Sequence, residues 1–260
     1  MDRRSFMGAM GGMTLMEANP AGGAPGQQKT KYYILEQFFL KNGTQPGRIN
    51  EAIRDGLLPA LNKVHAGPKI FMEALVAAHM PQFALILGFP SVEEFFSLSA
   101  ALRKQEGCAK AFEAWEAHPE PPYEHSSTIL LEAADYSPEI VPLDPPPKTP
   151  RIFELRVYHS PTHRQLAALH ERFAGSEIKI FHRCGVHPLF YSSTYFGENR
   201  PNLTYLIPFE NLAAREKAWA AFAADSEWIK VRKESIDKHG QISSVIQISL
   251  YRATPYSPIR

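Results

Sequence analysis

The sequence predicts an α+β protein built from two tandem ferredoxin-like units, each with the element order βαββαβ. The second half repeats the hydrophobic pattern of the first at a displacement of roughly 120 residues. Each half also alternates strand-like and helix-like patterns in the same order. The tripeptide Tyr-Ser-Pro occurs at residues 136–138 and again at residues 256–258. A chain of 260 residues is long enough for two such units, each with a core of its own.

The first unit is predicted over residues 29–136. It opens with a strand at Tyr32–Leu40, rich in aromatic and aliphatic residues. Strand patterns recur at 68–77 and 82–89, and Ser127–Ala134 closes the unit. Ser91 begins the second helix as its N-cap, with Glu94 in the position of a capping box. The first helix is predicted from apolar residues at helical spacing: Ile49, Ile53, Leu57, Leu61 and Val64.

The second unit, residues 151–258, repeats this order. Its helices are predicted around Leu166 and from Asn211 onward. Its strands are predicted at 151–158, 188–196, 203–209 and 244–251. Residues 137–150 between the units hold six prolines and no periodicity, which predicts an extended linker.

A βαββαβ unit places two helices on one face of a four-stranded antiparallel sheet and leaves the other face open. An open apolar face must be covered, and the second copy is the nearest partner. We therefore predict that the two open faces pack on each other as a dimeric α/β-barrel-like pseudo-dimer.

The N-terminal residues 1–28 differ from the globular pattern. Arg3 and Arg4 precede Phe6 and a short, weakly apolar stretch that ends near Met16. This arrangement resembles a twin-arginine export signal, which predicts a periplasmic or secreted protein. The alternative is a disordered terminus of a cytoplasmic protein.

Composition limits the partners. The formal net charge is +1, so no electrostatic footprint for nucleic acid is present. No apolar run is long enough for an integral membrane span. Cys108 and Cys184 belong to no CxxC pair, and their redox state is left open. A small-molecule ligand and a homo-oligomer remain as possible partners.

A stretch in the second unit carries a family resemblance. It reads Phe153-Glu154-Leu155-Arg156-Val157-Tyr158, followed later by Arg215, Glu216, Trp219 and the run from Asp225 to Trp228. These residues resemble the NIPSNAP domain of the dimeric α/β-barrel superfamily. The first unit matches less well, since Ile34 stands where the family has Glu. The resemblance implies a ferredoxin-like fold and no settled catalytic residues. By analogy with the wider superfamily, it leaves room for a cofactor-independent monooxygenase.

Alternation along the strands predicts which side chains face the cavity. If the apolar residues of 151–158 face the helices, then the polar residues of that strand point inward. The candidate ligand-binding residues are Glu154, Arg156, Tyr158, His187, Tyr191, Gln247, Tyr251 and Glu36. In the alternative interpretation, Glu154 and Arg156 form a structural ion pair, and Glu36 meets Arg156 across the pseudo-twofold axis.

No metal site and no cofactor are predicted. The sequence has no HExxH motif, no phosphate loop and no GxSxG elbow. His182 and His187 bracket Cys184, but three residues in one loop are a weak metal signal.

Two functions follow. The first is a non-catalytic exported barrel that binds a small organic ligand or a protein partner. The second is a cofactor-independent monooxygenase or isomerase that acts on a small aromatic or enolisable substrate, and it requires a cavity of several hundred Å3.

Overall fold

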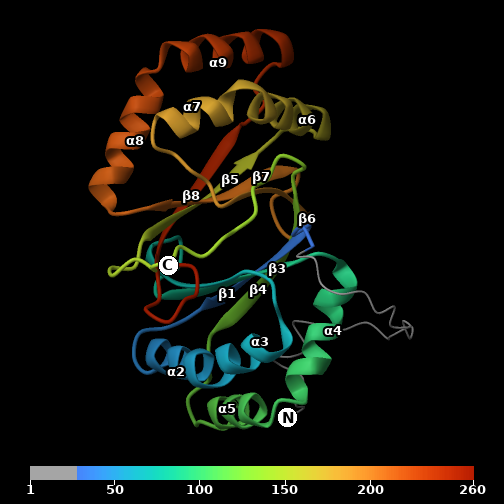
Figure 1. Cartoon of the computed structure of the whole chain (residues 1–260), viewed down its shortest axis with the longest axis vertical. Coiled ribbons are helices and arrows are strands. Elements are labelled where there is room, and N and C mark those ends of the chain that lie inside the picture. The colour runs from blue at the N-terminus through green and yellow to red at the C-terminus, as the bar shows by residue number, and fades with distance from the viewer. Residues whose placement is uncertain (1–27) are drawn as a thin grey trace.

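The computed structural model describes residues 28–260, which form a closed barrel of eight antiparallel strands with helices on two opposite sides (Figure 1). The first half comprises β1 Tyr32–Phe39, α2 Gln45–Glu51, a π-helical turn Ala52–Leu57, α3 Leu58–Val64, β2 Lys69–Val76, β3 Gln82–Phe89, α4 Val92–Arg103, α5 Glu106–Glu116 and β4 His125–Ala133. The second half comprises β5 Ile152–His159, α6 His163–Arg172, a π-helical turn Phe173–Glu177, α7 Ile178–Arg183, β6 Phe190–Phe196, β7 Asn202–Phe209, α8 Leu212–Ala224, α9 Ser226–His239 and β8 Val245–Ala253.

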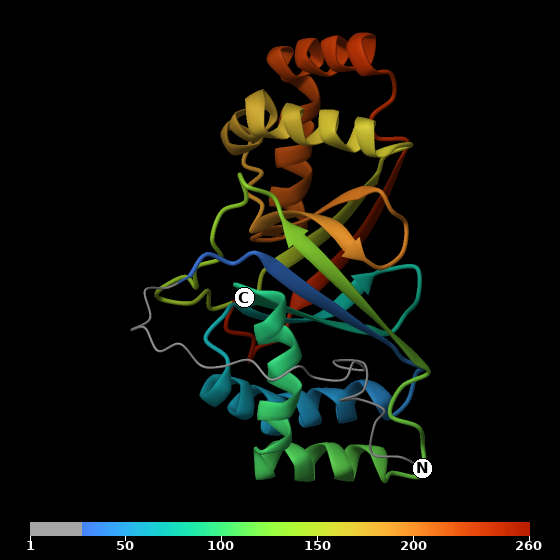
Figure 2. The same cartoon turned by 90° about the vertical axis from the view of Figure 1, so that its right-hand side faces the viewer.

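The strands follow one another around the barrel in the order β1-β3-β2-β8-β5-β7-β6-β4. Each half therefore contributes one four-stranded sheet, and the sheets join where β2 pairs with β8 and β4 pairs with β6. Each strand of the described residues therefore has a neighbour on both sides, which limits edge-to-edge association. The predicted α+β fold, with two ferredoxin-like units closed as a barrel, is confirmed. Figure 2 shows the barrel between its two helical layers.

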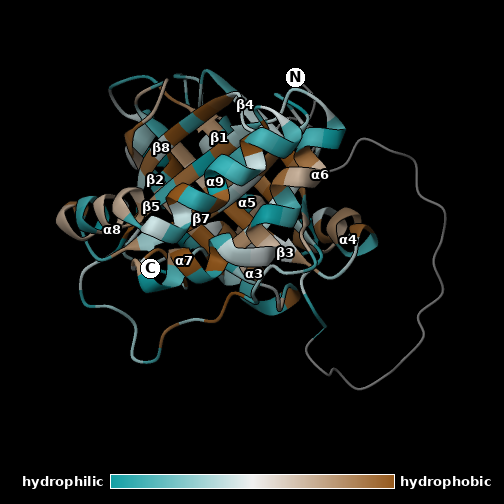
Figure 3. Cartoon of the chain, turned by 90° about the horizontal axis from the view of Figure 1, so that it is seen from above, coloured by the Kyte–Doolittle hydropathy of each residue, from teal (hydrophilic) through white to brown (hydrophobic). Residues whose placement is uncertain are grey.

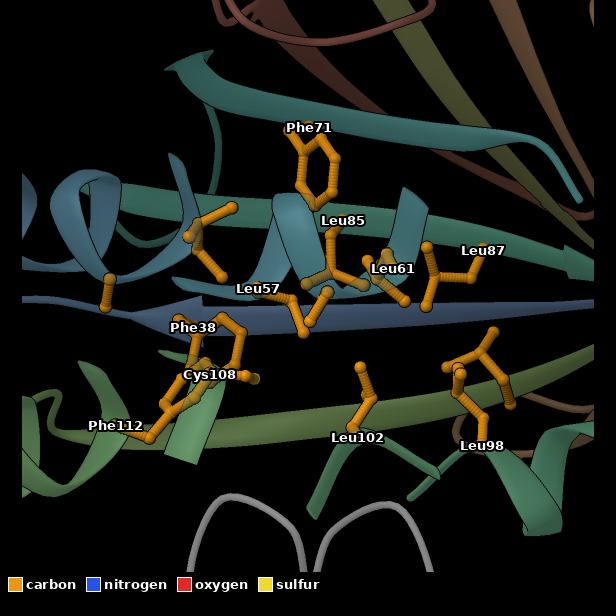
Figure 4. Packing of buried hydrophobic residues seen from close by; sticks show 14 of the residues in the cluster. Phe38, Leu57, Leu61, Phe71, Leu85, Leu87, Leu98, Leu102, Cys108 and Phe112 are labelled. Atoms are coloured by element: carbon orange, nitrogen blue, oxygen red, sulfur yellow. The ribbon is translucent and has the colours of Figure 1, made fainter. Parts of the chain in front are cut away.

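Three apolar clusters hold these layers together. One lies between the first sheet and α2 to α5, where Phe38, Leu61 and Phe112 pack (Figure 4). A second lies between the second sheet and α6 to α9, and a third fills part of the barrel interior. Hydropathy follows the same plan, with hydrophobic strands and polar outer faces on several helices (Figure 3). These clusters therefore cover both faces of each sheet, except for the first part of β8, which is exposed.

Side-chain caps set the starts of four helices. Ser91 caps α4 by accepting from the backbone N–H of Glu94 at 3.3 Å, as the capping-box pattern predicts. Thr162, Asn211 and Asp225 cap α6, α8 and α9 in the same way. Each cap supplies an acceptor to a first-turn N–H that has no partner within the helix.

The repeated Tyr-Ser-Pro tripeptides make the same corner in both halves. Ser137 Oγ accepts from the backbone N–H of Tyr191 at 3.0 Å, and Ser257 Oγ accepts from that of Phe71 at 3.0 Å. Beyond each corner an isoleucine, Ile140 or Ile259, joins the cluster inside the barrel. The linker and the C-terminal segment thus contribute to one end of the barrel.

Ile246 and Ile248 of β8 are 47% and 41% exposed. The helices of the second half leave this part of β8 uncovered. The predicted export signal lies outside the described residues, apart from residue 28. Within the described part of the chain, no helix combines the length and apolar character needed to cross a bilayer.

Candidate functional site

One end of the barrel encloses a chamber of about 590 Å3, a typical size for a small-ligand site. It lies where β1 and β5 end and where β3, β4, β7 and β8 begin. The lining residues are Leu35, Gln37, Phe39, Ala78, His79, Gln82, His125, Ser126, Ser127, Ile129, Leu131, Leu155, Val157, Thr194, Glu198, Asn202, Thr204, Asn199, Gln247, Ile248 and Ser249. We refer to this space as the chamber.

The barrel interior changes character along its axis. At the end opposite the chamber, Tyr33 stacks on Phe190 with ring centroids 4.4 Å apart, and Phe153 belongs to the same apolar cluster. At the chamber end, amide and hydroxyl side chains replace these rings. Glu198 is the one carboxylate among the described lining residues, which include no Lys or Arg. The chamber therefore suits an uncharged molecule that forms hydrogen bonds.

Tyr251 holds the deepest polar group at this end. Its phenol oxygen accepts hydrogen bonds from Gln37 Nε2 at 3.1 Å and from Gln82 Nε2 at 3.0 Å. The side chain is fully buried, and burial raises its pKa to about 12. The phenol is therefore protonated at neutral pH. Ser249, which lines the chamber, is a further side-chain hydrogen-bond partner of this phenol, so a ligand oxygen would take the place of Ser249 beside the Tyr251 O–H.

Two imidazoles stand at the mouth of the chamber. His125 stacks on Phe39 with centroids 4.3 Å apart, and His79 meets the His125 ring edge-on at 5.6 Å. His79 Nε2 lies 2.7 Å from the carbonyl oxygen of Leu40, so this nitrogen carries a proton and donates. The other ring nitrogen of a neutral His79 is then a proton acceptor. These rings provide flat aromatic surfaces and, together with the Glu198 carboxylate, the acid–base groups of the chamber lining.

Of the candidate residues from the sequence, Gln247 lines the chamber and Tyr251 lies in the barrel interior beneath it. The predicted orientation of β5 is wrong. Phe153 and Leu155 face the interior, whereas Glu154, Arg156 and Tyr158 face the helices. The reason is that both faces of this sheet are buried, so alternation alone cannot tell the interior from the helix side.

Glu154 and Arg156 instead belong to a buried ionic cluster between β5 and α8, which we call the Glu154 cluster. Glu154 is fully buried, and its carboxylate lies 2.7 Å from Arg156 Nε and 2.5 Å from Arg215 Nε. Trp219 Nε1 donates to the same carboxylate at 3.0 Å, and the Arg156 guanidinium lies 3.9 Å from the centre of a Trp219 ring. The expected Glu154–Arg156 ion pair is present, and its place is architectural.

The remaining candidates also lie outside the chamber. Glu36 points toward the helices of the first half, where Thr128 Oγ1 donates to it at 2.5 Å; it does not pair with Arg156. Tyr191 packs among aromatic rings on the helix side of the second sheet. His187 is exposed and stacks on His182 with centroids 5.0 Å apart. None of the three can contact a chamber ligand from these positions.

Sequence reasoning missed Gln37, Gln82, Asn202, His79 and His125. A signal was available, because Gln82 and Asn202 occupy equivalent positions of the repeat and each opens a buried strand with an amide. Amides at the same end of two paired sheets indicate a polar end to an otherwise apolar interior.

Metal binding finds no support in the described residues, where no three His, Cys, Asp or Glu side chains converge in a suitable arrangement. Cys108 and Cys184 are both free thiols.

Comparison with known proteins agrees with this fold. Residues 153–258 match the NIPSNAP family model. The expected resemblance is thereby confirmed for the second half, which contains the Glu154 cluster. No curated protein matches the sequence.

Solved structures extend the likeness over both halves. An anthrone oxidase-like protein superposes with a TM-score of 0.54 at 10% identity, covering 87% of this chain and 92% of its own. A variant of chlorite dismutase from Candidatus Nitrospira defluvii gives 0.46 at 8% identity over 88% of this chain and 93% of its own. A NIPSNAP family protein of unknown function from Agrobacterium tumefaciens gives 0.39 at 17% identity over 44% of this chain and 97% of its own. At 10% identity, the likeness to the anthrone oxidase-like protein is one of fold.

Proposed function

We propose that this protein binds a small, uncharged organic molecule in the chamber through a carbonyl or hydroxyl oxygen held by Tyr251. The observation that carries the proposal is the Tyr251 phenol, whose oxygen already accepts from Gln37 and Gln82. A phenol in this state offers its proton to an acceptor. Around it stand neutral amides and hydroxyls, which can bind further polar groups of the ligand.

Charge supports the same class of ligand. An anionic group entering the chamber would lose its hydration without meeting a Lys or Arg, because the described lining residues include neither, and Glu198 is the one carboxylate among them. The Phe39 and His125 rings at the mouth favour a flat ligand by offering apolar faces.

The first test is native mass spectrometry of full-length protein purified from its own host, followed by titration with anthrone, a flat uncharged ketone. We expect either the mass of a ligand retained from the host or saturable binding of anthrone. The Tyr251→Phe variant should weaken binding roughly tenfold, the cost of one hydrogen bond to a buried group.

The matched control is Tyr191→Phe. Tyr191 is equally buried but lies on the helix side of the sheet, so its substitution should leave binding unchanged. Binding that is equally strong in Tyr251→Phe would overturn the proposal, and so would the absence of both a retained ligand and saturable anthrone binding.

A second candidate is a cofactor-independent monooxygenase or isomerase, favoured by the imidazoles at the chamber mouth. In this scheme a His79 or His125 nitrogen removes an acidic C–H proton from the bound ketone. With anthrone and dioxygen the balanced products are anthraquinone and water. Absorbance of anthraquinone under air, lost in His79→Gln and His125→Gln, would support catalysis over binding alone. Binding without product would support the first candidate.

Export through the twin-arginine-like segment stays a proposal. Replacing Arg3 and Arg4 by Lys should retain the protein in the cytoplasm if the pair is read by an export system. Fractionation of the host with an antibody against the protein measures this directly. Wild-type protein found in the cytoplasm would contradict export, and an exported Lys-Lys variant would contradict a role for the arginine pair.

A further inference from the structure

A second site lies outside the barrel, in a groove of about 650 Å3 between the end of β4 and α6. At its base His170 joins two hydroxyl groups. Tyr136 Oη lies 2.7 Å from His170 Nδ1, and His170 Nε2 lies 2.8 Å from Ser193 Oγ. Tyr136, His170 and Ser193 all line the groove, which we call the β4–α6 groove.

The first half has a different hydrogen-bond network at the equivalent repeat positions. There, Tyr256 Oη donates to Asn50 Oδ1 at 2.7 Å, and Asn50 Nδ2 donates to Glu73 at 2.7 Å. Tyr256, Asn50 and Glu73 occupy the repeat positions of Tyr136, His170 and Ser193. An amide and a carboxylate therefore connect the same corner to the same helix and strand. The second half has an imidazole and a hydroxyl group in their place.

We propose that Ser193 is a nucleophile activated by His170, with Tyr136 as the residue that positions the imidazole. We assign the proton of the neutral imidazole to Nδ1, where it donates to the Tyr136 phenol oxygen, so that Nε2 accepts from the Ser193 hydroxyl; the distances of 2.7 Å and 2.8 Å fit this tautomer. Burial lowers the pKa of His170, so the ring is neutral and can act as a base at neutral pH.

The charged residues around the groove limit the class of substrate from which Ser193 could take an acyl group. Glu132, Asp135 and Glu171 line the groove, and no Lys or Arg is among its described lining residues, so an anionic donor is disfavoured. Ser193 pairs with Glu132 in β4 and with Leu203 in β7, so main-chain groups around it belong to the sheet. The main-chain N–H groups of this strand therefore contribute little to the stabilisation of an oxyanion. The substrate class is a small activated ester or thioester, uncharged or cationic.

The reaction has two balanced steps. Ser193 Oγ bonds to the acyl carbon while its proton passes to His170 Nε2, and the departing alcohol or thiol takes that proton as its bond to carbon breaks. Water then bonds to the same carbon and gives a proton to His170. His170 returns this proton to Ser193 Oγ as the bond between Ser193 Oγ and the acyl carbon breaks and the carboxylic acid is released. The groove lies outside the barrel, so the chamber ligand has no part in this chemistry.

The test is covalent labelling of the full-length protein with an uncharged alkyl fluorophosphonate, read by intact mass and peptide mapping. We expect one phosphonyl group per chain on Ser193, with loss of fluoride. Ser193→Ala should abolish labelling. Ser97→Ala, which removes an exposed hydroxyl on α4, should not change it.

The decisive variant is His170→Asn, which copies Asn50 of the first half and keeps a donor and an acceptor at this position. It should fold with a similar melting temperature and slow labelling on the order of 100-fold, the contribution typical of a general base. Labelling at another residue, no labelling of the wild type, or an unchanged rate in His170→Asn would each overturn the proposal.

Discussion

The two halves of this barrel keep the same backbone corners and yet fill their sheet-to-helix interfaces in different ways. Both Tyr-Ser-Pro corners place a serine hydroxyl against a strand N–H, at 3.0 Å in each case. The strand positions beside the helices differ, because Ile34 and Glu36 of β1 correspond to Glu154 and Arg156 of β5. The two halves therefore share their corner hydrogen bonds, whereas the interface between sheet and helices is apolar in one half and ionic in the other.

The ionic interface of the second half is stable only when all of its charged partners are present. Glu154 forms ion pairs with Arg156 and Arg215 and accepts a hydrogen bond from Trp219, whereas Ile34 of the first half packs in an apolar cluster. A buried ion pair adds little net stability compared with apolar packing, but loss of one partner leaves a charge uncompensated. The halves should therefore respond unequally to matched substitutions.

The largest effect is expected from Glu154→Gln, which removes the negative charge from the Glu154 cluster. Loss of one partner from a buried pair costs about 3–5 kcal/mol, because the remaining guanidinium groups keep their desolvation penalty. Ile34→Val, at the same repeat position, should cost about 1 kcal/mol as a buried methylene is lost. Urea denaturation of both variants measures the difference, and equal losses would contradict the comparison.

A matched surface control is Glu216→Gln. Glu216 also pairs with Arg215, but its side chain is 71% exposed. Its substitution should leave the unfolding midpoint unchanged, since water already screens the charge.

Glu36 predicts a pH dependence of stability that belongs to the first half. Burial raises its pKa from 4.5 to about 7, although the Thr128 hydrogen bond acts in the opposite direction. Between these two values the folded state holds a proton that the unfolded state has released. Stability from this group is therefore complete below pH 4.5 and is lost as the pH rises through 7, by about 3 kcal/mol at the standard conversion of pKa shifts.

The measurement compares the free energy of unfolding of the wild type and Glu36→Gln from pH 5 to pH 8. Glu177 in the second half also has a pKa raised to about 7 by burial, so the wild type carries two contributions of the same sign. Glu36→Gln should remove one of them. If both proteins lose the same stability across this range, the pKa of Glu36 is not raised.

The smallest effect is expected at the shared corners. Ser257 Oγ accepts from Phe71 and also donates to the carbonyl of Ile259 at 2.7 Å, whereas the donation by Ser137 to Pro138 is 3.5 Å long. Ser257→Ala should destabilise by about 1–2 kcal/mol and Ser137→Ala by about 1 kcal/mol, because each leaves a buried N–H without its acceptor. Thermal unfolding of both variants tests this order. A larger loss in Ser137→Ala would show that the corners are not equivalent in the way their geometry indicates.

Much of the fold could be read from the pattern of residues. The repeat offset, the βαββαβ order and the Ser91 capping box each depend on local spacing, and spacing is visible in a chain. The candidate site could be read only in part: Gln247 and Tyr251 lie at or beneath the chamber, while Glu154, Arg156 and Tyr158 do not. Alternation says that neighbouring side chains oppose each other, but it does not say which side is the barrel interior.

By itself, the sequence determined a duplicated α+β chain, its linker, its repeated corners and its resemblance to the NIPSNAP family. Tertiary structure alone decided that the polar residues of β5 meet α8, that a polar chamber opens at one end of the barrel, and that His170 joins Tyr136 to Ser193. The physical reason is that these arrangements depend on contacts between residues far apart in the chain, where desolvation and ion pairing outweigh any local preference.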